Sequence, residues 1–139
     1  MTDKSKSMGY IEIPHTADRM LKIWATDYRT LLVQALNGMY SLMEVQVSNE
    51  AKVIKEFSLN AFDRESLLIL FLSEMLFYLE EENLVFFDVS IDINENNLLV
   101  KCKGSKITDI TKSIKAVTYH NLKIIKVGSL LEVNIVFDC

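Results

Sequence analysis

Apolar and polar residues alternate along much of the chain, the pattern of a β-strand with one buried face. In the last such segment Leu131, Val133, Ile135 and Phe137 share one face, so Asp138 is expected to point away from the core. Asn94–Asn97 and Gly128–Ser129 are typical turn sequences and predict two hairpins. The predicted strands are residues 19–25, 52–59, 85–93, 98–102, 115–127 and 130–138.

Two segments show helical spacing of apolar residues instead. The first follows Thr26 and Asp27, which offer an N-cap, and its apolar positions run from Leu31 to Met43. The second, residues 64–82, follows Asp63 as a cap and is apolar on nearly all sides. That composition indicates burial against a sheet or between two layers.

The order strand, helix, strand, helix and then antiparallel strands predicts an α+β fold. We expect a two-layer single domain, a mostly antiparallel sheet packed with two main helices. No repeat, low-complexity tract or Pro/Gly-rich linker divides the chain. Residues 1–9 are expected to form a flexible N-terminal segment and residues 10–139 the domain.

Charge and composition narrow the function. A formal net charge of -4 and a pI near 5.2 give no basic footprint, so tight direct nucleic-acid binding is not expected. Two cysteines without C-x-x-C spacing suit a reducing compartment, which indicates the cytoplasm. The longest apolar runs fall short of the ~20 residues that span a bilayer, so no membrane association is expected.

Few residues offer catalytic chemistry. The sequence has two histidines and four glycines, with no phosphate-binding loop, no G-x-S-x-G and no Cys/His metal spacing. His15 and Asp18 stand before the first predicted strand, either as turn residues or as a ligand or acid/base pair. Lys115 and His120 open the penultimate strand, where they are either solvated or functional.

Asp138 allows two interpretations. It is a frayed terminal residue, or, if the last strand is held in the sheet, its carboxylate is presented together with the α-carboxylate of Cys139. Completed by Asp18, the second arrangement would be an oxygen-rich site. Such a site suits Ca²⁺, Mg²⁺ or Mn²⁺ better than zinc.

Three short motifs occur in register with a known family. "HTAD" at 15–18, "KAVTYH" at 115–120 and "VFDC" at 136–139 together resemble the archease family, and the resemblance covers Tyr10 to Cys139. It implies a small α+β protein that is not itself an enzyme. It implies also that the chain assists the GTP-dependent tRNA-splicing RNA ligase, promoting guanylylation of the ligase and its multiple turnover.

The same resemblance implies a metal site on Asp18, Asp138 and Cys139, with Ca²⁺ the expected ion and Mg²⁺ or Mn²⁺ as alternatives. His15, Lys115 and His120 match other motif positions and are candidates for contact with the ligase. The chain departs from the family pattern at Arg19 and Met20, where small or aliphatic residues are usual, and at Cys139, usually aliphatic. Two other functions stay open: a stand-alone metal-dependent phosphate-ester hydrolase and a metal-free interaction module.

Overall fold

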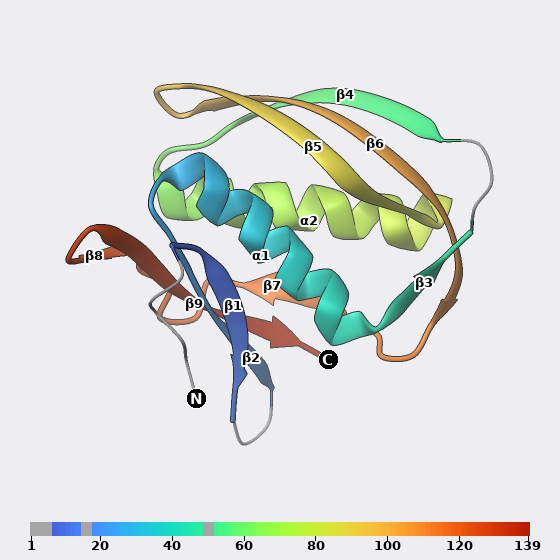
Figure 1. The fold of residues 1–139 in the computed structure, drawn as a ribbon, viewed down its shortest axis with the longest axis horizontal. Helices are drawn as coiled ribbons and strands as arrows, with labels where there is room; N and C mark the ends of the chain where they lie inside the picture. Colours follow the sequence, from blue (N-terminus) through green and yellow to red (C-terminus); the bar gives the residue numbers. More distant parts are fainter. Residues whose placement is uncertain (1–6, 15–17, 49–51) are drawn as a thin grey trace.

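The structure, a computed structural model, describes residues 7–14, 18–48 and 52–139. Its strands form two antiparallel sheets (Figure 1). In the first sheet the order is β1-β2-β9-β7, and β8 pairs with β9 as well. The strands of this sheet are β1 (Gly9–Ile13), β2 (Arg19–Ala25), β7 (Ala116–Thr118), β8 (Ile125–Val127) and β9 (Leu130–Asp138).

The second sheet is built around one long strand, β6, which pairs with the other three. β5 and β6 form the hairpin predicted at Asn94–Asn97, with Asn94 and Asn97 as its last pair. The strands of this sheet are β3 (Val45–Val47), β4 (Val53–Asn60), β5 (Leu84–Asn94) and β6 (Asn97–Ile110).

Two helices, α1 (Tyr28–Met43) and α2 (Arg64–Glu82), lie between the two sheets and contact strands of both (Figure 1). The α+β class, the mostly antiparallel pairing and the two helices are confirmed, whereas the expectation of two layers is corrected to sheet, helices and sheet. Buried residues lie on most sides of α2 because the helix has a sheet on either side, so the fold has three layers.

The helices begin and end where local chemistry allows. The predicted caps are confirmed: Asp27 accepts a hydrogen bond from the Thr30 amide at 2.8 Å, and Asp63 accepts one from the Ser66 amide at 2.7 Å. Both helices end at a left-handed residue, Glu44 with φ 52° and Asn83 with φ 57°. These residues turn the chain into β3 and β5.

The strands agree with the sequence prediction in part. β1 and β3 were not predicted, because five and three residues are too few to show a clear alternation. The segment predicted as one strand at 115–127 is interrupted and pairs with β9 in two pieces, β7 and β8. In β9 the predicted inward residues Val133, Ile135 and Phe137 are buried and Asp138 is exposed, but Glu132 and Val136 on the opposite face are buried too.

Neither α1 nor α2 is both long and apolar enough to cross a membrane, and the described residues contain no other helix of that kind.

Candidate functional site

The start of β2 and the end of β9 meet at one edge of the first sheet. Arg19 pairs with Phe137 in the antiparallel register of the two strands. Continued by one residue, this register places Asp18 opposite Asp138. Residues that face one another across an antiparallel pair point to the same side of the sheet. Local pairing therefore brings together the two aspartates that the sequence singled out.

β9 is held in the sheet as far as Asp138. On its other side Asp138 pairs with Ala116 of β7, and its carbonyl accepts a hydrogen bond from the Lys115 amide at 2.7 Å. The interpretation of Asp138 as a frayed end is therefore wrong. Its side chain is exposed, and so are Lys115 and Cys139, so a bound partner could reach all three.

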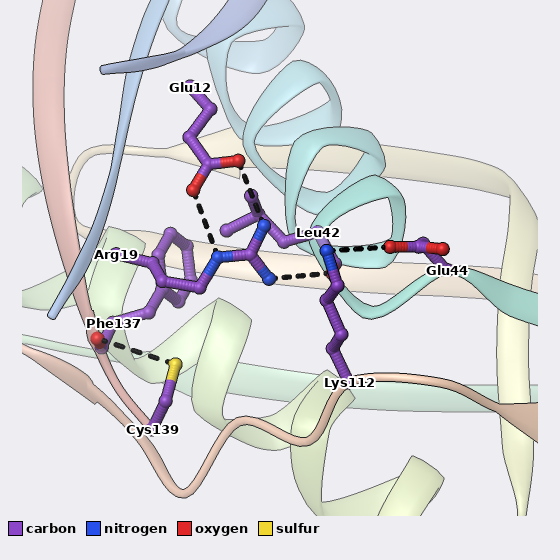
Figure 2. A network of polar contacts seen from close by, with 7 residues as sticks. All are labelled: Glu12, Arg19, Leu42, Glu44, Lys112, Phe137 and Cys139. Carbon is purple, nitrogen blue, oxygen red and sulfur yellow. Dashed lines mark hydrogen bonds and ion pairs between the residues drawn. The ribbon is translucent and has the colours of Figure 1, made fainter. Parts of the chain in front are cut away.

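Arg19 ties this edge to α1 (Figure 2). Its guanidinium donates two hydrogen bonds to the Glu12 carboxylate, from Nε at 2.9 Å and from Nη2 at 2.8 Å. Its Nη1 donates to the Leu42 carbonyl in the last turn of α1 at 2.8 Å. A cation at this end of a helix is favoured by the helix dipole and satisfies a carbonyl that has no partner within the helix.

Charges around Arg19 reinforce one another. The hydrogen bonds from Arg19 hold the pKa of Glu12 below its ordinary value, and the same bonds raise the pKa of Arg19. Electrostatic attraction to Cys139 raises the pKa of Arg19 further. Figure 2 shows the Cys139 thiol directed to the Phe137 carbonyl.

A second set of contacts links the C-terminal end of α1 to the segment before β7. The amides of Thr111 and Lys112 both donate to the Met43 carbonyl, at 3.2 and 3.1 Å. The Lys112 ammonium lies 2.9 Å from the Glu44 carboxylate, and both side chains are about half exposed. The end of α1, the segment that leads into β7 and the start of β2 are thus joined on one side of the candidate site (Figure 2).

A divalent cation such as Ca²⁺ would need several oxygen ligands at this edge. Among residues 7–14, 18–48 and 52–139, no group of three His, Cys, Asp or Glu side chains is arranged to hold a metal. The edge instead offers two aspartates and the α-carboxylate of Cys139, which is not a side chain. This oxygen-only set has the chemistry of a hard-cation site.

The partner-contact candidates are placed differently. Lys115 lies beside Asp138, whereas β7 carries the chain away from that end of β9, so His120 lies beyond the far end of β7. There the His120 backbone amide donates to Thr118 Oγ1 at 3.3 Å, and the ring Nε2 lies 3.3 Å from the side-chain Nδ2 of Asn121. His15 lies outside the described residues.

Sequence reasoning treated Arg19 only as a departure from a family pattern and missed Glu12 altogether. One signal could have found Arg19. It has the same parity as Leu21, Ile23 and Ala25, the buried face of β2, and a charged residue at an inward position requires a partner.

The sequence is similar to known proteins over most of its length. Residues 10–139 match the model of the Archease protein family. A protein named archease-like from Dictyostelium discoideum is 30% identical over 145 aligned positions, covering 96% of this chain and 93% of that protein. A protein named archease from Sulfurisphaera tokodaii is 28% identical, covering 89% of this chain and 94% of its own length.

Solved structures show the same fold. The crystal structure of an archease from Thermotoga maritima, described as a possible chaperone, superposes with a TM-score of 0.70 at 26% identity, covering 91% of this chain and 94% of that chain. The family match spans both β2 and β9, and with them the edge where Asp18, Lys115 and Asp138 meet. This chain therefore belongs to the Archease protein family.

Proposed function

We propose that this chain is a protein cofactor of the GTP-dependent tRNA-splicing RNA ligase, and that it promotes guanylylation and multiple turnover of that ligase without being an enzyme itself. The observation that supports this most is that β9 is paired with β2 up to Phe137 and with β7 up to Asp138, a register that sets Asp138 across from Asp18. A frayed terminus could not present a defined group to another protein, whereas a strand paired on both sides can.

The proposed site holds a divalent cation, with Ca²⁺ the preferred ion and Mg²⁺ or Mn²⁺ as alternatives. Asp18 and Asp138 would supply side-chain oxygens, and Cys139 would supply its α-carboxylate. When bound, the cation would neutralise the repulsion between these carboxylates and present positive charge to phosphate oxygens.

Two basic residues, Lys115 and Arg19, lie at or near this proposed cation site. Lys115 is exposed, and its backbone amide donates to the Asp138 carbonyl, so Lys115 lies at the end of β9 where a bound ligase could contact it. Arg19 is held by Glu12 and Leu42 and fixes the edge of the sheet from behind. In transfer of a nucleotidyl group, positioning and neutralisation of the phosphates supply most of the catalysis, and a protein acting in trans can contribute both.

The first test measures guanylylation of the purified ligase with GTP, with and without this chain. Wild-type protein is expected to stimulate the reaction, and Asp138→Asn or Asp18→Ala is expected to return it to the unstimulated rate. Asp92→Asn is the matched control, because Asp92 is an exposed aspartate on β5 of the other sheet. Full stimulation by folded Asp138→Asn protein would contradict the role given to this site.

The second test addresses the cation directly. Ca²⁺, Mg²⁺ and Mn²⁺ are titrated calorimetrically into the chain and into a version extended by three residues beyond Cys139. Saturable binding that both the extension and Asp138→Asn weaken is expected if the α-carboxylate is a ligand. Equal binding by the extended chain would remove Cys139 from the ligand set, and binding by neither form would leave a metal-free cofactor.

A further inference from the structure

α2 leaves one line of side chains uncovered by the two sheets. Leu70 is 38% exposed and Phe77, two turns later on the same side of the helix, is 52% exposed. Glu74 lies between them at helical spacing, and the exposed Glu81 follows one turn after Phe77. We call these four residues the α2 face. Its two apolar residues point outward from a helix whose other apolar residues are largely buried.

Phe77 belongs to a row of aromatic rings. Its ring centroid lies 6.0 Å from that of Tyr78, in an edge-on arrangement, and Tyr78 lies 5.7 Å from Phe57 of β4. The half-buried Tyr78 also lies 5.6 Å from the ring of the buried Phe86, so the row runs from the core to the surface and ends at Phe77. A ring supported in this way loses little conformational entropy when a partner covers it, as is typical of the residues that dominate binding energy at interfaces.

Carboxylates surround this apolar stripe. The last turn of α2 holds Glu80, Glu81 and Glu82 and contains no basic residue, so these charges oppose the helix dipole. Glu82 is paired with Lys55 at 3.1 Å. No described cation lies within ion-pair distance of Glu80, Glu81 or Glu74. Lys55 and the Lys106 ammonium, which donates to the Glu82 carbonyl at 2.8 Å, thus offset the charge at Glu82 only, and Glu74, Glu80 and Glu81 have no ion-pair partner in the part of the chain that the structure describes.

We propose that the α2 face docks on a basic, partly apolar surface of the RNA ligase, with Phe77 as the anchor and Glu74 and Glu81 paired with arginine or lysine side chains of the ligase. This inference rests on the proposed function. An enzyme that binds RNA carries basic side chains along the path of the phosphates, which supplies the charge complementary to this face.

Charge distinguishes the ligase from other occupants. A second copy of this chain docked through the same face in a two-fold dimer would set carboxylates against carboxylates, because such interfaces are self-complementary. An anionic lipid surface would repel the same groups. A basic, partly apolar protein surface can instead pair with the carboxylates of the α2 face and also cover its two apolar side chains.

The test measures binding of the ligase to this chain by fluorescence anisotropy at two salt concentrations. Phe77→Ser is expected to raise Kd at least tenfold, the loss typical of a central aromatic anchor. The double variant Glu74→Lys and Glu81→Lys is expected to raise Kd at low salt and to reverse the weakening of binding by added salt.

The matched controls lie on β4, in the second sheet. Ile54, 71% exposed, and Glu56 lie on the exposed side of β4, and Ile54→Ser and Glu56→Lys are expected to bind as wild type does. Circular dichroism and calorimetric titration of Ca²⁺ verify that each variant is folded and that the Asp138 edge is unchanged.

The outcomes separate the two proposals. If wild type binds and stimulates the ligase while the α2 variants bind as tightly as the Ile54 and Glu56 controls, the docking surface is wrong and the cofactor function stands. If wild type neither binds nor stimulates the ligase, the cofactor function fails and the docking inference fails with it. Selective loss of binding in the α2 variants supports both.

Discussion

Replacing Arg19 by methionine tests whether the contacts in Figure 2 stabilise the edge that carries Asp138. Methionine keeps the apolar stem of the side chain and removes its charge and donors. The bond to the Leu42 carbonyl is partly buried and charge-assisted, and such bonds contribute about 1.5 to 3 kcal/mol. The pair with Glu12, whose side chain is 44% exposed, adds about 0.5 to 1 kcal/mol.

The expected loss is therefore about 2 to 4 kcal/mol of unfolding free energy. The unfolding entropy of a chain of 139 residues is about 0.3 kcal/mol per degree near the midpoint, so Tm is expected to fall by about 7 to 13 °C. Scanning calorimetry at pH 7 measures this directly, and urea titration checks that the two-state slope is unchanged.

Lys112→Met provides the matched control. It removes an ion pair to Glu44 in which both side chains are about half exposed, and such pairs are worth about 0 to 1 kcal/mol, or at most about 3 °C in Tm. The reasoning is refuted if Arg19→Met lowers Tm by no more than Lys112→Met does. That result would mean that Arg19 is only a solvated neighbour of the site.

Two further predictions concern other parts of the chain. Because Arg19 holds the pKa of folded Glu12 below its ordinary value of 4.5, the stabilising contribution of Glu12 is complete above about pH 5 and is lost as pH falls through the folded pKa. The stability difference between wild type and Glu12→Gln should therefore shrink between pH 6 and pH 3 in urea titrations, and a constant difference would contradict the pairing. Gly104→Ala should destabilise the protein by at least about 3 kcal/mol, because a Cβ there would overlap the Val85 carbonyl oxygen in the backbone of the neighbouring strand β5. Gly128→Ala, whose Cβ would meet open space but whose φ is +61°, should cost only about 1 to 2 kcal/mol by comparison, and equal effects of the two changes in thermal unfolding would show that the overlap is relieved.

Sequence patterns predicted both helices and most of the long strands because each carries a repeated signal, whereas β6 (Asn97–Ile110) was predicted only over residues 98–102. The cap at Asp27 or Asp63 followed by helical spacing, and the alternation along β9, extend over two or more periods. β1, β3 and the interruption between β7 and β8 carry no such signal. The interruption depends on distant contacts, among them the bond from the Ile124 amide to the Glu65 carboxylate of α2. Contacts of this kind do not appear in local periodicity.

The arrangement of sheet, helices and sheet could not be predicted from the pattern of one helix. The apolar residues around α2 predicted that it is covered on most sides, and the structure confirms this. They did not show whether a helix or a second sheet packs on the other side of α2. The answer lies in the pairing of β6 with β3, β4 and β5, which makes a sheet separate from that of β2 and β9.

Strand parity and register explain why part of the candidate site could be predicted and part could not. Asp138 follows the buried Phe137 and must point outward, and the antiparallel pairing of β2 with β9 then sets Asp18 across from it. Arg19 has the opposite parity, so it points inward to the end of α1, where Glu12 and the Leu42 carbonyl receive it. The sequence contains that parity, but Glu12 lies on β1, a strand that sequence reasoning did not predict. Because β1 was not predicted, Glu12 could not be named as the partner of Arg19. Arg19 was therefore treated only as a departure from the family pattern.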